Sequence, residues 1–328
     1  MSCNEIAFNS TNDGIHLASS ILWFDSFNSE DLSFVSSAPD KSTNFKSKIL
    51  ASEVTIQLIE NQSRKPNALV CQFNRPFSIG RLKMELLPSG SGLGGASLFV
   101  ETGNHKSILY SPRPMLQRNQ TVRQMQLKKA DILILRAEHP DPTSIMPNRK
   151  KEWDRLIETT QSMVKRGEFP IIMCSSYPTA QEITKTFSDA QIPLAVHDSI
   201  YKINKIYENN GSELGTYSRL GTRKAKNKVV LFPHVEGRRF RTRIPEGPIF
   251  SIEGTNSESH GPDPFQKIVH RFFLGSNCDG KDLREIISTV GAKEVYIFGP
   301  YTKRYTENFL LNGLSTKGLY PDQQPTLL

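Results

Sequence analysis

The chain has 328 residues, and its 41 Lys and Arg against 33 Asp and Glu give a formal net charge of +8. Apolar residues make up 37% and charged residues 23%, which is typical of a folded globular protein and excludes a disordered chain. No apolar run is long enough to cross a membrane, and residues 1–9 lack the pattern of a secretory signal. The four cysteines include no CxxC pair, which disfavours a zinc finger or redox motif and favours a cytoplasmic location.

The N-terminal part of the chain predicts strands joined by polar loops. Apolar runs predict strands at residues 16–24, 32–35, 68–73 and 82–87, and a helix, or a helix plus a strand, over residues 47–60. The Gly/Ser-rich segment 88–95 predicts a turn, which we name the glycine turn. Residues 102–106 predict a hairpin between strands at 96–101 and 107–111.

From about residue 129 onward, strands alternate with helices. Buried strands are predicted at residues 132–135, 169–174, 193–196 and 228–232, and helices at residues 150–166 and 180–190. After a Pro/Gly/Ser-rich stretch, 245–264, the alternation resumes over residues 272–274, 283–290, 294–298 and 305–311. Such alternation is typical of α/β layering.

Several framework positions follow one another in a characteristic order. They are Asp25 at a strand end, Phe34-Val35-Ser36, the glycine turn, Tyr110-Ser111, Ala180-Gln181-Glu182-Ile183 and the last strand within 291–299. This order resembles the metallo-β-lactamase-fold nucleases with a β-CASP insertion, which include messenger-RNA 3′-end-processing endonucleases and bacterial ligase-associated exonucleases. The resemblance covers nearly the whole chain. It implies an α/β protein whose αββα sandwich is formed by residues 1–145 and 248–328, with a β-CASP-like α/β insert over residues 146–247.

The metal positions of this family fall on residues that cannot hold zinc. In the family, histidines and a bridging carboxylate hold two zinc ions for phosphodiester hydrolysis. The resemblance places the metal positions on Ser37, Pro39, Lys41, Ser42, Ser91 and Arg113, and the β-CASP positions on Arg136, Asn277 and Phe298. Asp25 and Asp279 are retained. We therefore expect a pseudo-nuclease with no catalytic residue, no metal and no cofactor.

Two alternatives use other parts of the sequence. A zinc site elsewhere is disfavoured because the seven histidines include no H-x-H or H-x-x-x-H pair, the spacing that zinc sites commonly use. The glycine turn also matches the pattern G-x-G-x-x-G. A strand rather than a helix is predicted after it, which disfavours a dinucleotide-binding site.

The basic residues suggest a polyanionic partner. They cluster at residues 149–151, 223–228 and 238–243, as expected of a protein that binds DNA or RNA. The resemblance would bring Lys41, Arg113 and Arg136 to the former metal site, where they could hold a phosphate. Arg239, Arg241 and Arg243 alternate along a possible strand and would form a basic edge. A solvated surface is the alternative for each cluster.

Three classes of function remain open at this stage. The first is a non-catalytic nucleic-acid-binding protein or nuclease-complex subunit, which would act on DNA or RNA. The second is a scaffold or regulatory partner of an active nuclease homologue or another protein subunit, with no nucleic-acid contact. The third is a metal-free hydrolase with a rebuilt site.

Overall fold

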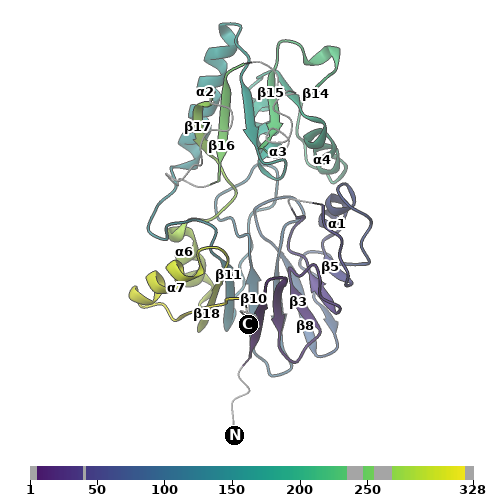
Figure 1. Ribbon diagram of the computed structural model, residues 1–328, viewed down its shortest axis with the longest axis vertical. Coiled ribbons are helices and arrows are strands. Elements are labelled where there is room, and N and C mark those ends of the chain that lie inside the picture. The colour runs from purple at the N-terminus through teal and green to yellow at the C-terminus, as the bar shows by residue number, and fades with distance from the viewer. Residues whose placement is uncertain (1–5, 40–41, 235–246, 255–267, 322–328) are drawn as a thin grey trace, which may run out of the picture.

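The computed structural model describes residues 6–39, 42–234, 247–254 and 268–321 (Figure 1). Within these ranges the chain forms three β-sheets and six α-helices, which confirms the predicted α/β class. None of the helices in the described ranges combines the length and apolarity that a bilayer crossing requires.

The first sheet is built from the N-terminal residues. Its strands are, in order across the sheet, β1 (Phe8–Thr11), β2 (Gly14–Leu17), β3 (Leu22–Phe24), β4 (Leu32–Phe34), β5 (Ile49–Ala51) and β6 (Ala68–Val70). β1 to β3 are antiparallel, whereas β3 to β6 run parallel. Helix α1 (Glu53–Glu60) follows β5 and begins where the Ser52 hydroxyl accepts a hydrogen bond from the Thr55 amide.

The second sheet combines strands from both ends of the chain. They are β7 (Phe77–Ile79), β8 (Leu82–Pro88), β9 (Ala96–Glu101), β10 (Ser107–Ser111), β11 (Ile132–Arg136), β18 (Glu294–Phe298) and β19 (Thr316–Gly318). β7 to β10 are antiparallel, while β10, β11, β18 and β19 are parallel neighbours. Parallel strands point the same way, so the carboxyl ends of these four strands lie along one edge of the sheet.

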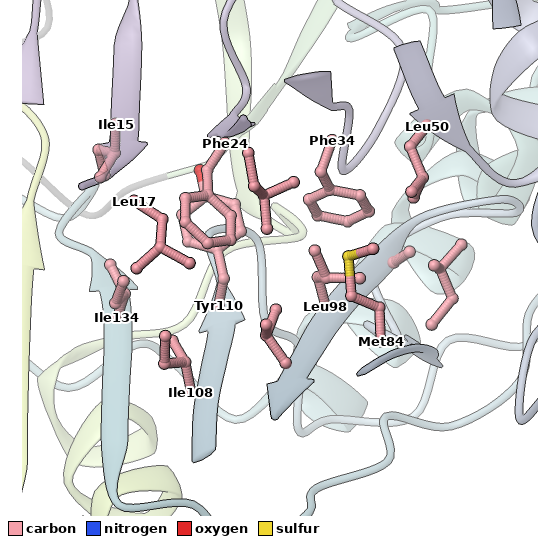
Figure 2. Close-up of a cluster of buried hydrophobic side chains, with 14 of the residues drawn as sticks. Ile15, Leu17, Phe24, Phe34, Leu50, Met84, Leu98, Ile108, Tyr110 and Ile134 are labelled. Carbon is pink, nitrogen blue, oxygen red and sulfur yellow. The ribbon is translucent and has the colours of Figure 1, made fainter. Parts of the chain in front are cut away.

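The first and second sheets pack face to face. Phe24 and Phe34 of the first sheet meet Leu98 and Tyr110 of the second in an apolar core (Figure 2). Helices α6 (Gly280–Val290) and α7 (Thr302–Leu311) cover the outer face of the second sheet, and α1 covers part of the outer face of the first. The layers therefore run helix, sheet, sheet, helix, and we call this part the sandwich.

The third sheet forms a separate layer above the sandwich in Figure 1. Its elements are α2 (Arg149–Lys165), β12 (Ile171–Cys174), α3 (Thr179–Asp189), β13 (Leu194–Val196), α4 (Asp198–Asn209), β14 (Ser218–Arg219), a short 3-10 turn (Arg223–Ala225), β15 (Val229–Pro233), β16 (Ile249–Glu253) and β17 (Ile268–Phe273). The strand order is β14-β13-β15-β12-β16-β17, and every neighbouring pair is parallel. We call these elements the insert.

The insert follows β11 in the chain and precedes α6. The sequence places the return to the sandwich at residue 248, but β16 and β17 still pair in the third sheet, with Phe250 opposite His270. β16 lies within the Pro/Gly/Ser-rich stretch 245–264, where no strand was predicted. Its residues 249–252 are all buried, as expected of an interior strand covered on both faces.

A buried ion pair lies in the insert near the points where the chain enters it, at α2, and leaves it, after β17. Arg149, the first residue of α2, pairs with Glu182 of α3 and donates a hydrogen bond of 2.8 Å to the carbonyl oxygen of Gly275. The Arg149 side chain is 11% exposed and the Glu182 side chain only 1%. Removing either charge would leave the other buried without its counter-ion, which is costly.

We predict that Glu182→Gln lowers the free energy of unfolding by about 3–5 kcal/mol, because Arg149 keeps its charge in a largely buried site. Chemical denaturation measures this loss. The matched control is Lys185→Gln, which breaks the exposed Lys185–Asp189 pair on the same helix and should cost less than about 1 kcal/mol. Equal losses for the two variants would contradict the prediction.

Candidate functional site

A cleft of about 590 Å³ opens at the edge of the sandwich where strands of both sheets end. Its lining comes from the β1–β2 turn, from the ends of β3, β4, β10, β11 and β18, and from the segment after β19. Ligand sites commonly lie outside the carboxyl ends of parallel strands, because the loops that follow can bring polar side chains together there.

The cleft brings together six of the site residues singled out in the sequence. They are Asp25, Ser37, Pro39, Arg113, Arg136 and Phe298. Ser42, Ser91, Asn277 and Asp279 are not among the residues that line it. Lys41, Arg239, Arg241 and Arg243 lie outside the described residues.

Asp25 joins the two sheets at the floor of the cleft. Its carboxylate accepts hydrogen bonds from the Ser36 amide (2.7 Å), the Ser36 hydroxyl (2.8 Å) and the Tyr110 hydroxyl (2.8 Å). The backbone of Asp25 has φ of 50°, a left-handed conformation that aspartate tolerates better than most residues. Burial and the neighbouring Asp25 charge raise the pKa of Tyr110 well above its usual value, so the phenol stays neutral and donates.

Arg113 and Arg136 reach the cleft from adjacent strands of the second sheet. Ser111 pairs with Leu135, so the next positions along the two parallel strands, Pro112 and Arg136, lie side by side with Arg113 just beyond. The positive charges of both guanidinium groups lower the pKa of the Tyr110 phenol and so oppose the rise that burial causes. Arg136 forms an ion pair with Glu138 at 3.1 Å, with side chains 35% and 21% exposed.

Phe298 and Gly299 shape the floor beside the arginines. Phe298 pairs with Arg136 across the parallel strands β11 and β18, and its ring stacks on Tyr110 with centroids 5.9 Å apart. Gly299 has φ of 108°, and a Cβ there would lie 2.9 Å from the Arg136 Cγ. Glycine at this position therefore leaves room for the Arg136 side chain.

Ser91 lies in the glycine turn, which contacts the insert. The Leu93 amide donates to the Tyr207 hydroxyl and the Leu93 carbonyl accepts from the Tyr177 hydroxyl, both at 3.0 Å. A Cβ on Gly92 would lie 2.6 Å from the Tyr177 oxygen, so only glycine allows this approach. The glycine turn therefore connects the sandwich to the insert. Tyr177 and Tyr207 make this connection, and neither was singled out from the sequence.

The remaining predicted residues have structural contacts. The Asp279 side chain accepts hydrogen bonds of 2.9 Å from the amides of Asp282 and Met146, so it begins α6 and holds the entry to the insert. Asn277 lies beside Gly254. Ser42 is exposed, with its hydroxyl 3.1 Å from that of Ser63.

The side chains of the cleft do not fit the zinc ions that the resemblance implies. Pro39 and Phe298 carry no ligand atom, and the guanidinium groups of Arg113 and Arg136 repel a cation. Within the described ranges, no group of three or more His, Cys, Asp and Glu side chains is arranged to hold a metal ion.

We predict that Tyr110→Phe lowers the free energy of unfolding by about 1–3 kcal/mol, because it leaves the part-buried Asp25 carboxylate with one donor fewer. Tyr305→Phe is the matched control: Tyr305 is equally buried, and its hydroxyl has no hydrogen-bond partner in the described part of the chain. Thermal or urea unfolding should show little loss for the control. A Tyr110→Phe protein as stable as wild type would refute a structural role for this hydrogen bond.

Comparison with known proteins shows a distant similarity over most of the chain. No family model matches the chain. The chain is similar to a probable DNA ligase of Opitutus terrae, with 22% identity over 314 residues. The alignment covers 95% of this chain but 31% of the ligase, so the chain spans about a third of that protein's length.

Proposed function

We propose that this chain is a catalytically inactive relative of the metallo-β-lactamase-fold nucleases that binds DNA without cutting it. One observation carries the proposal. Positions far apart in the sequence line one cleft: Ser37, Pro39 and Arg113, which the resemblance assigns to the metal site, and Arg136 and Phe298, which it assigns to the β-CASP motifs. Convergence at one place is expected if the register of the resemblance is correct. The residue types are those of a site without metal.

The loss of hydrolysis follows from this set of side chains. Two-metal nucleases generate hydroxide on the metal and neutralise the phosphate with the same ions. Arginines can take over the second role, because a guanidinium binds phosphate oxygens in a bidentate, charge-assisted manner. They cannot lower the pKa of a bound water as zinc does. Arg113 and Arg136 would therefore hold a phosphate and leave it intact.

The insert corresponds in this proposal to the β-CASP-like part of the family. We assign to it the elements from α2 to β17, because β16 and β17 complete its parallel sheet. The glycine turn would hold this part against the sandwich through Tyr177 and Tyr207.

The similarity to a probable DNA ligase favours DNA over RNA as the polymer. Because the chain matches only 31% of that protein, ligase activity is not part of the proposal. Phosphate contacts carry no base information, so we expect binding with little dependence on sequence. The alternative function is a scaffold that pairs with an active homologue and does not contact DNA. A negative result in the binding test below would favour this alternative.

We predict that the full chain binds single-stranded DNA with an affinity that falls steeply with salt, because each neutralised phosphate releases counterions. Arg113→Gln with Arg136→Gln should weaken binding and reduce the slope of log K against log salt by about 1–2. Lys165→Gln with Arg166→Gln, at the far end of α2, is a control of equal charge change and should alter the slope less. Fluorescence anisotropy at several salt concentrations measures these slopes. An unchanged slope in the double variant of Arg113 and Arg136, an equal change of slope in the control, or no DNA binding at all would refute the proposal.

We also predict that the purified protein carries less than one zinc ion per chain and that a chelator leaves its melting temperature unchanged. No folding free energy is tied to metal if the cleft has no ligands for it. Elemental analysis and thermal scans with and without chelator test this. Stoichiometric zinc together with a lower melting temperature in chelator would overturn the inactive assignment.

A further inference from the structure

The cleft has two chemically different walls. Arg113 and Arg136 form the cationic wall, and Ser37 is among the lining residues with them. Phe27 and Pro39 belong to the apolar part of the lining. The Phe27 ring packs against Phe45, with centroids 5.5 Å apart in an edge-on arrangement. A site of this composition suits a ligand with an anionic end and a flat apolar end.

The size of the cleft limits what can enter it. Its volume of about 590 Å³ lies within the range of roughly 300–1,000 Å³ that small-molecule sites occupy. A base pair inside a duplex cannot enter such a site, because its bases are stacked and paired. An unpaired nucleotide is small enough and has both chemical ends.

The charges of the cleft favour a phosphate at a chain end over a phosphate inside a strand. The Asp13 and Asp25 carboxylates in the lining oppose any anion, and Glu138 already occupies Arg136. A terminal phosphate carries about 1.5 to 2 negative charges and three acceptor oxygens, against one charge on an internal phosphodiester. It can compete with Glu138, because a part-exposed ion pair is worth only about 0–1 kcal/mol.

We propose that the cleft binds a single unpaired nucleotide by its terminal phosphate, with the phosphate between Arg113 and Arg136 and the base against Phe27 and Pro39. This inference rests on the proposed function in one respect, because both place the ligand in the same cleft. A free mononucleotide and the phosphorylated end of a strand share this chemistry, and the experiment separates the two sources.

The first arm of the test uses calorimetric titration of the full chain with a deoxynucleoside monophosphate, the matching nucleoside and inorganic phosphate. We expect the monophosphate to bind at least about tenfold more tightly than either fragment, since only it reaches both walls. Arg136→Gln should weaken it about tenfold. Glu138→Gln should tighten it several-fold by releasing Arg136, a gain that a misfolded variant cannot produce. Equal binding of nucleoside and monophosphate, or no gain for Glu138→Gln, would overturn the inference.

The second arm compares a linear strand bearing a terminal phosphate with a circular single strand of the same sequence. We expect the linear strand to bind more tightly and the mononucleotide to compete with it. If both strands bind equally and the mononucleotide does not compete, the inference fails while the proposed DNA binding stands. If the mononucleotide binds but neither strand does, the proposed DNA binding fails and the cleft is a site for free nucleotides.

Discussion

The hydrogen bond from Tyr110 to Asp25 links the two sheets of the sandwich at the place where the cleft forms. Asp25 directly follows β3 and also accepts from the amide and hydroxyl of Ser36, just beyond β4, so one carboxylate fixes two strand ends of the first sheet against β10 of the second. A carboxylate that is partly withdrawn from water is stable only when its oxygens are satisfied. Here three donors satisfy it, and the aromatic rings of Phe24 and Phe298 flank the phenol that supplies one of them.

A carboxylate fully engaged in such contacts can persist after the chemistry around it changes. Arg113 and Arg136 come from strand ends and the loops that follow them, where substitution disturbs the core less than within a strand. Under the proposed function, this explains how one architecture can present arginines, a proline and a phenylalanine at positions that the resemblance assigns to the metal and β-CASP motifs. The fold therefore limits where a ligand can bind, while the side chains at the strand ends decide which ligand it is.

Much of the strand and helix pattern was predictable from the sequence because it depends on local periodicity. The hairpin of β9 and β10, the buried strand β11 and the amphipathic helix α2 all match their predicted segments closely. The predicted strand 16–24 is instead two antiparallel strands, because Ser19 has φ of 58° and reverses the chain. β16 was missed, since its four buried residues are surrounded by residues typical of turns. α4 was missed too, although Ile200, Ile203 and Tyr207 bury one face of it.

The sequence by itself determined the α/β class, the residue types at each candidate position and the excess of positive charge. It could suggest, through a resemblance, that Arg113 and Arg136 belong to one site. Only the tertiary structure decided that they meet, because their proximity follows from the parallel pairing of β10 with β11, two strands separated by a long loop. The same is true of Ser91, which tertiary packing assigns to the joint with the insert and not to the cleft. Local patterns fix which face of an element is apolar, but contacts between distant segments depend on how those faces pack together.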